Sequence, residues 1–110
     1  MILVKDNSTN TTMTKPASLY GDVVITFVSS DISKGIFNGN TPTNELGPDV
    51  YSLGYNHAIF IPSLNMTKVA ETSWGLEFVV NIRDAQQYML NSGDLLNITT
   101  SNKTLTFQKL

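Results

Sequence analysis

Hydrophobic and polar residues alternate most regularly in the last third of the chain, from Trp74 to Leu110. Successive strand side chains point to opposite faces, so such alternation predicts strands with one buried face. The pattern predicts a strand over Trp74–Arg83, a turn at Asn91–Asp94, and a hairpin of Leu95–Thr100 with Lys103–Lys109. The inward positions share an apolar character: Leu76, Phe78, Val80, Ile82, Leu96, Ile98, Leu105 and Phe107.

The earlier part of the chain contains further short apolar segments. Tyr20–Ser30 is predicted to be a strand with two fairly apolar faces, which is typical of a central strand or a partner contact. Shorter strands are predicted at Val50–Leu53, His57–Ile61 and Asn65–Ala70, and Pro62 ends the second because proline donates no hydrogen bond to a sheet. Two segments are predicted to lack strands: a long loop over Asp31–Pro48, rich in Gly, Asn and Pro, and a short helical turn within Asp84–Leu90.

These elements predict an all-β domain of about seven short strands, either a sandwich or a small barrel. Residues 5–18 are polar and rich in Asn and Thr, which indicates a flexible lead-in. The predicted organisation is therefore a lead-in over residues 1–18 and one β domain over residues 19–110.

Composition shifts the picture toward a surface built from neutral polar groups. Charged residues make up 15% of the chain, whereas 11 Asn, 13 Thr and 10 Ser supply polarity; about 25% charged residues is typical. A surface of amides and hydroxyls suits acidic surroundings, where carboxylates lose their charge, and it suits a surface partly covered by glycans. The alternative is that Thr simply favours strands while Asn and Ser favour turns.

Several function classes lack the residues they need. The net charge is −2 without a basic run, which argues against nucleic-acid binding, and the absence of cysteine excludes a disulfide framework and thiolate chemistry. The single histidine, His57, has no nucleophile motif beside it, so we predict no enzyme, no cofactor and no metal site. A calcium ion held by Asp31, Glu45 or Asp49 of the long loop is the one metal alternative.

Five Asn-x-Ser/Thr sequons stand out in this composition, where roughly two are expected by chance. Such sequons are the acceptors of N-linked glycans in secreted proteins. The candidate glycosylation sites are Asn7, Asn10, Asn65, Asn97 and Asn102. Coincidence in an Asn-rich and Thr-rich chain is the alternative.

Candidate interface residues follow from apolar positions on faces that are otherwise polar. Val79 lies between Glu77 and Asn81 on the outward face of its predicted strand. With neighbours from other strands it would form a patch large enough to bind a protein; these are Val24, Val28, Ile59 and Ile61. Ile36 and Phe37 either anchor the long loop on the core or contact a partner.

The pattern of strand and turn residues in several segments resembles a known family. Gly21–Phe27 (GDVVITF), Trp74–Ile82 (WGLEFVVNI) and Asn91–Thr99 (NSGDLLNIT), after a Thr-rich lead-in, are similar to the archaellin-like domains of archaea, most of all to the archaellum accessory proteins F and G. The resemblance covers about residues 20–108. It implies an immunoglobulin-like β-sandwich outside the cytoplasmic membrane, with an N-terminal membrane helix that this sequence does not include.

The resemblance also implies a function. An F or G protein acts as a stator of the archaellum motor, binding the surface-layer protein or its partner subunit, so we expect a non-enzymatic envelope domain that self-associates as a homodimer or a filament-like oligomer. Its only membrane contact would be through the absent helix. Two alternatives stay open: the head domain of an archaellin or type IV pilin-like filament subunit, and a carbohydrate-binding or adhesin sandwich using Tyr51, Tyr55 and Trp74.

Overall fold

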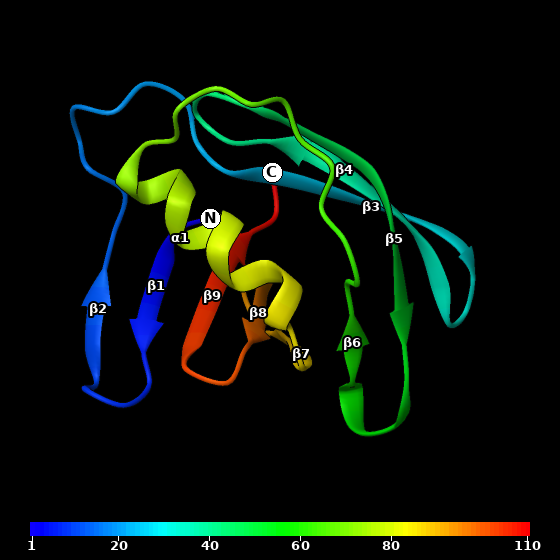
Figure 1. Ribbon diagram of the computed structural model, residues 1–110. Helices are drawn as coiled ribbons and strands as arrows, with labels where there is room; N and C mark the ends of the chain where they lie inside the picture. The colour runs from blue at the N-terminus through cyan, green and yellow to red at the C-terminus, as the bar shows by residue number, and fades with distance from the viewer.

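The computed structural model describes residues 1–110 as a mostly β domain with two antiparallel sheets and one α-helix (Figure 1). The strands are β1 (Leu3–Asp6), β2 (Thr11–Met13), β3 (Val24–Asp31), β4 (Lys34–Asn40), β5 (Glu45–Leu53), β6 (Ile59–Phe60), β7 (Gln87–Asn91), β8 (Leu95–Thr99) and β9 (Lys103–Gln108). The helical elements are α1 (Ser73–Asn81) and two 3-10 turns, η1 (Tyr55–His57) and η2 (Ile82–Asp84).

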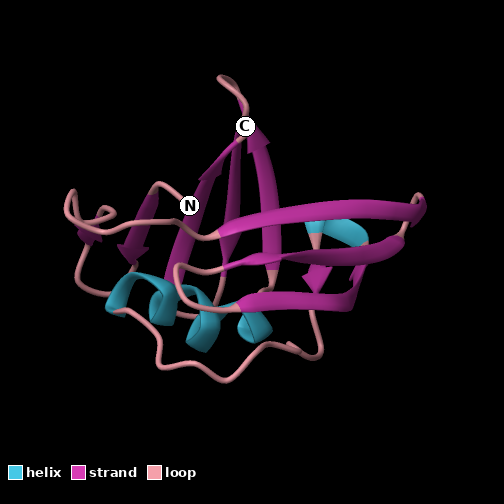
Figure 2. Ribbon diagram, turned by 90° about the horizontal axis from the view of Figure 1, so that it is seen from above, coloured by secondary structure: helices cyan, strands magenta, loops and turns pink.

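The two sheets are built differently. The five-stranded sheet has the order β2-β1-β9-β8-β7, so the first and last strands of the chain pair with each other. The four-stranded sheet, β3-β4-β5-β6, is a simple meander of consecutive strands. Figure 2 shows β3, β4 and β5 running across the direction of the other sheet's strands, with α1 to one side. The architecture agrees with the predicted all-β class, with the addition of a helix.

The predicted C-terminal hairpin and the first long strand are confirmed. β8 and β9 pair in register from Leu95↔Gln108 to Thr99↔Thr104, after a turn at residues 92–94. β3 lies within the predicted Tyr20–Ser30 segment except for its last residue, Asp31. It is an edge strand of its sheet, so the central position that its two apolar faces suggested is wrong. Alternation with one buried face was a sufficient signal for the hairpin, whereas β3 was recognisable as a run of apolar residues with two fairly apolar faces.

The strand predicted over Trp74–Arg83 is wrong, because this segment forms α1 and η2. The Thr72 hydroxyl caps the helix by accepting a hydrogen bond from the Gly75 backbone N–H at 3.0 Å. Three large side chains at helical spacing are fully buried: Trp74, Phe78 and Ile82. Spacing of four residues places them on one helix face, while Leu76 and Val80 of the alternating pattern are exposed.

The long loop predicted over Asp31–Pro48 is also wrong. It contains β4 and the first half of β5, and Phe37 of β4 is completely buried. The glycines that suggested a loop serve close packing instead, since a Cβ at Gly39 would lie 1.9 Å from the Val24 carbonyl oxygen. Register shifts between Phe37 and Gly39 accommodate the irregular part of the β4–β5 pair.

Residues 1–18 differ from the expected flexible lead-in. β1 pairs with β9 from Leu3↔Thr106 to Asp6↔Lys103, and β2 pairs with β1. The physical reason is that Met1 and Val4 bury their side chains in the core, which outweighs the polar composition of the residues that follow.

The remaining differences concern short segments. Asp84–Leu90 was predicted as a helical turn, but Asp84 ends η2 and most of the rest forms β7. The strand expected over His57–Ile61 is reduced to β6, and Asn65–Ala70 contributes only an isolated bridge between Met66 and Leu46. Short apolar runs of this kind do not by themselves distinguish a strand from a connection.

The core lies between the two sheets and under α1. Its fully buried members come from both sheets and the helical segment: Val23, Phe37, Ile61, Trp74, Phe78, Ile82, Ile98 and Leu105. Phe78 of α1 meets Phe107 of β9 edge to face, with ring centroids 6.2 Å apart. The Trp74 indole N–H donates to Asp22 at 2.9 Å, which ties the helix to the segment entering β3.

Candidate functional site

The outer face of the four-stranded sheet carries a row of exposed apolar side chains. Val28 of β3 is directly opposite Ile36 of β4, and Ile36 is directly opposite Val50 of β5. Their exposed fractions are 55%, 41% and 58%, respectively. Directly opposed side chains on neighbouring strands touch, so these residues form one continuous Val28–Ile36–Val50 stripe across three strands.

Alternation along each strand explains why the stripe faces outward. Each stripe residue has an aromatic neighbour in sequence that points inward: Phe27, Phe37 and Tyr51. These rings pack together, with Phe27 5.1 Å from Tyr51 and 6.1 Å from Phe37 between centroids. Because the aromatic residues occupy the core, the aliphatic residues beside them must face solvent.

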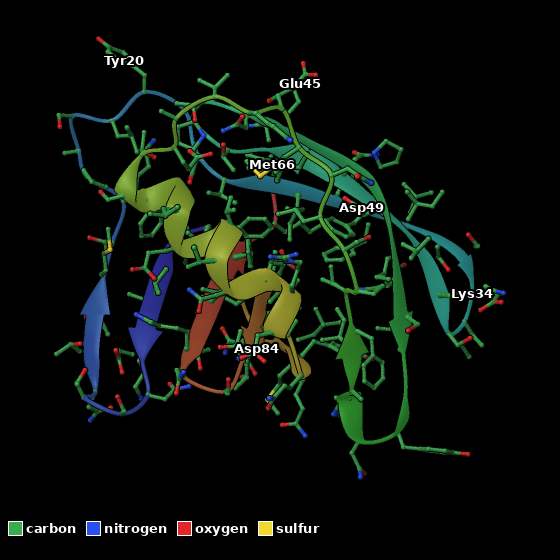
Figure 3. All side chains as sticks on the ribbon, viewed as in Figure 1. Tyr20, Lys34, Glu45, Asp49, Met66 and Asp84 are labelled. Atoms are coloured by element: carbon green, nitrogen blue, oxygen red, sulfur yellow. The ribbon has the colours of Figure 1, made fainter.

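The surface around the stripe is apolar or neutral apart from one exposed ion pair. Phe60 of β6 is 55% exposed and pairs with Ser52, two residues beyond Val50 on the same face. A shallow hollow of about 410 Å³ adjoins the stripe, lined in part by Ile36, Val50 and Pro62. This ion pair is formed by Lys34, near the tip of the β3–β4 hairpin (Figure 3), whose Nζ lies 4.0 Å from Oδ2 of Asp31. Such a surface suits an apolar protein contact.

The candidate interface residues separate into three groups. Val28 and Ile36 lie on the stripe. Val24 and Val79 are half-buried, Val79 in α1 rather than on a strand. Ile59, Ile61 and Phe37 are buried in the core. The predicted patch centred on Val79 therefore does not form, since it required Trp74–Arg83 to be a strand.

Sequence reasoning missed two members of this surface, Val50 and Phe60. Both lie within predicted strands, Val50–Leu53 and His57–Ile61, so the available signal was their alternation with buried Tyr51 and Ile59. It also missed a larger apolar cleft of about 870 Å³ between β3 and the ends of β7, β8 and β9. Leu90, Leu95 and Leu96 beside the Asn91–Asp94 turn were the sequence signal for that cleft.

The residues considered for chemistry do not converge. His57 is exposed, and its ring meets Tyr88 edge to face at 5.4 Å. No group of three or more His, Cys, Asp or Glu side chains is placed to hold a metal ion, so Asp31, Glu45 and Asp49 do not form the calcium site considered above. Trp74 and Tyr51 are buried, which leaves Tyr55 as the only exposed member of the suggested carbohydrate platform.

A buried polar cluster holds the connection between β6 and α1 in place. The Asn44 side chain donates to Glu71 at 2.8 Å and to the Val69 carbonyl at 2.9 Å, and it accepts from the Val69 N–H at 2.9 Å. Thr41 and Thr43 also donate to the Glu71 carboxylate, at 2.6 and 3.0 Å. Burial alone would raise the pKa of Glu71, but these hydrogen bonds outweigh it and lower the pKa.

Three aspartates near turns have lowered pKa values because they accept hydrogen bonds from serine and threonine groups. The Ser8 hydroxyl, followed by the Thr9 and Ser8 backbone N–H groups, lowers the pKa of Asp6 to about 2. The Ser33 backbone N–H and hydroxyl lower the pKa of Asp31. Ser101 lowers the pKa of Asp84 in the same way, by its hydroxyl first and its N–H second. Each carboxylate fastens a turn and keeps its charge in more acidic solution.

The glycosylation candidates occupy different environments. Asn7, Asn10 and Asn102 are exposed in the β1–β2 and β8–β9 turns, whereas Asn65 is exposed on the connection after β6 and Asn97 is half-buried in the middle of β8.

Fold and surface together define a β-rich domain of two antiparallel sheets, one of which has an apolar outer face. Comparisons with family models, curated proteins and solved structures find no match to this chain. No helix of the structure has the length and apolar character needed to cross a membrane.

Proposed function

We propose that this chain is a non-enzymatic interaction domain of the cell envelope, of the archaellum stator type, which binds the surface-layer protein through the Val28–Ile36–Val50 stripe. The observation that carries the proposal is the stripe itself. Three aliphatic side chains opposed across β3, β4 and β5 remain exposed, although on the inner face of the same strands Phe37 and Tyr51 are buried and Phe27 is partly buried. Covering this row with a partner would remove its apolar surface from water, which is favourable and would stabilise the complex.

The chemistry of the surface supports a location outside the cytoplasmic membrane. The chain carries few charges and many Asn, Thr and Ser residues. The lowered pKa values of Asp6, Asp31, Glu71 and Asp84 keep these carboxylates ionised in more acidic solution than their ordinary values of 3.8 and 4.5 would allow. Both properties suit an external compartment of low pH.

The proposal takes the two sheets as a variant of the immunoglobulin-like sandwich, the finer fold that the family resemblance implies, in which the sheets cross instead of running nearly aligned. Support comes from the return of the chain after the four-stranded sheet, which places β9 beside β1 in antiparallel pairing. α1 is then an addition between β6 and β7.

A filament-subunit head is the second candidate, and a different feature favours it. β3 is an eight-residue strand at the edge of its sheet and contains neither Lys nor Pro, the residues that commonly protect edges from pairing. Pairing between the β3 edges of adjacent subunits would extend the sheet from one copy to the next.

Co-sedimentation of the purified chain with isolated surface-layer sheets, at acidic and neutral pH, tests the first candidate. We expect saturable binding that Val50→Lys weakens roughly tenfold or more, because desolvating an unpaired ammonium group in an apolar contact costs more than about 1.4 kcal/mol. Val80→Lys is the matched control, since Val80 is 63% exposed but lies on α1.

Two outcomes would contradict the proposal. Equal loss of binding in both lysine variants would show a general effect of charge rather than a contact at the stripe. Absence of saturable binding by the unmodified chain at either pH would exclude the surface layer as the partner, and concentration-dependent self-assembly in the same samples would then favour the filament subunit.

A further inference from the structure

Two turns that are distant in the sequence meet at one end of the five-stranded sheet. The Asn7 backbone N–H donates to the Asn102 carbonyl at 2.8 Å, and the Thr104 hydroxyl donates to the Asn7 side-chain oxygen at 3.2 Å. Figure 1 shows the β1–β2 and β8–β9 turns together at the lower end of this sheet, away from both termini. Three of the five sequons, those of Asn7, Asn10 and Asn102, therefore lie at one end of the molecule.

The side-chain amides at this end are free in the sense that glycosylation requires. All three asparagines are exposed, and the Nδ2 atom of none of them donates a hydrogen bond within the chain. Asn10 lies in the turn with a positive φ of 62°, and Asn7 uses only its oxygen, which a glycosylated asparagine retains. A sugar on any of these nitrogens enters solvent without displacing a protein contact.

The other two sequons are less suitable. The Nδ2 atom of Asn65, which would carry the sugar, donates to the buried Asp49 carboxylate at 2.8 Å. Asn97 lies in β8 between β7 and β9, is half-buried, and accepts a hydrogen bond from Thr106 at 2.7 Å. A glycan at either position would disturb packing or an existing hydrogen bond.

We propose that N-linked glycans are attached at Asn7, Asn10 and Asn102, making this turn pair the glycan-bearing end of the domain, while Asn65 and Asn97 stay unmodified. The inference rests on the external location that is part of the proposed function. The three sites belong to the five-stranded sheet and the Val28–Ile36–Val50 stripe to the other, so the glycans leave the stripe uncovered.

The chemistry requires a lipid-phosphate-linked oligosaccharide as the donor. The asparagine Nδ2 attacks the first sugar carbon, C1, and an N–C1 bond forms while the C1–O bond to the lipid phosphate breaks. The lipid phosphate leaves with the bonding electron pair, and one Nδ2 proton passes to a base of the transferase. No oxidation or reduction takes place.

The test is secretion of the full chain, with a signal segment supplied, from a host that attaches N-glycans, followed by intact-mass measurement and glycopeptide mapping. We expect Asn7→Gln, Asn10→Gln and Asn102→Gln each to remove the mass of one glycan. The matched controls Asn65→Gln and Asn97→Gln should leave the mass distribution unchanged apart from the substitution.

Glycan on Asn65 or Asn97 in the folded, secreted protein would overturn the placement, as would absence of glycan from all three turn sites. These failures are distinct from failure of the proposed function, because surface-layer binding is measured separately on unglycosylated chain. A glycosylated chain whose unmodified form does not bind surface-layer sheets would overturn only the binding proposal.

Discussion

Asn44 is the side chain on which the long connection from β6 to α1 depends. It is 3% exposed, and both ends of its amide are occupied by hydrogen bonds to Thr67, Val69 and Glu71. The amide is the suitable group here, because it donates to a carboxylate and accepts from a backbone N–H at the same time. Nothing in the local sequence distinguishes Asn44 from the ten other asparagines.

Replacing Asn44 tests this arrangement. Asn44→Ala should lower the free energy of unfolding by about 2–4 kcal/mol, since it leaves several buried polar groups without partners. Asn44→Asp should be at least as damaging near neutral pH, because a second carboxylate would face Glu71. Urea denaturation measures both, and Asn38→Ala, at an exposed position of β4, is the control. A change below about 0.5 kcal/mol for Asn44→Ala would show that the cluster adds little to stability.

At the level of elements, α1 shows where the sequence pattern was ambiguous. Residues 74–82 satisfy both a period of two, through Leu76, Phe78, Val80 and Ile82, and a period near four, through Trp74, Phe78 and Ile82. Two adjacent valines favoured a strand by propensity. The decisive signals were the largest side chain, Trp74, at the first buried position, and Thr72 as a helix cap.

The cap provides a specific test of the helix. Thr72→Ala should lower stability by about 1 kcal/mol, because the Gly75 N–H loses its partner, and Thr72→Asp should restore most of the loss. The neighbouring Ser73→Ala is the control, since Ser73 is exposed and makes no capping bond. Chemical denaturation followed by circular dichroism gives the values. Equal effects of the alanine variants at 72 and 73 would argue against the cap.

For the whole molecule, the sequence predicted the class of fold and part of the candidate surface. The hairpin β8–β9 was predictable because one face is apolar and turn residues flank it, and strand β3 was predictable because it is a run of apolar residues. β1, β2 and β4 were not, because their polar or glycine-rich stretches become strands only through pairing with distant partners. Val28 and Ile36 were identifiable as apolar positions, but only the register joins them to Val50.

Acid stability is a property of the whole molecule, because the carboxylates with lowered pKa lie in separate segments. A carboxylate with a lowered folded-state pKa stabilises the fold above its ordinary pKa, 3.8 for Asp and 4.5 for Glu, and this contribution is lost as the pH falls through the folded value. We therefore expect the free energy of unfolding to decline as the pH falls below 4.5, the ordinary pKa of Glu71, and to continue declining to about pH 2, where Asp6 titrates.

Carboxyl-carbon NMR titration, with urea denaturation at each pH, measures this decline. Ser8→Ala removes the largest cause of the Asp6 shift and should move its titration midpoint upward. An Asp6 midpoint at the ordinary value of 3.8 in the unmodified chain would contradict the expectation.

The pairing of β1 with β9 has a mechanical consequence. Leu3 lies opposite Thr106 and Asp6 opposite Lys103, so the start of β1 and the end of β9 lie side by side. Tension applied to Met1 and Leu110 would separate the two strands from this end and break the β1–β9 hydrogen bonds one after another. A force applied instead between the start of β1 and the Val28–Ile36–Val50 stripe would act across the core between the two sheets, so the packed core would resist it all at once. The direction in which force is applied, rather than the number of contacts, then determines the force at which this domain unfolds.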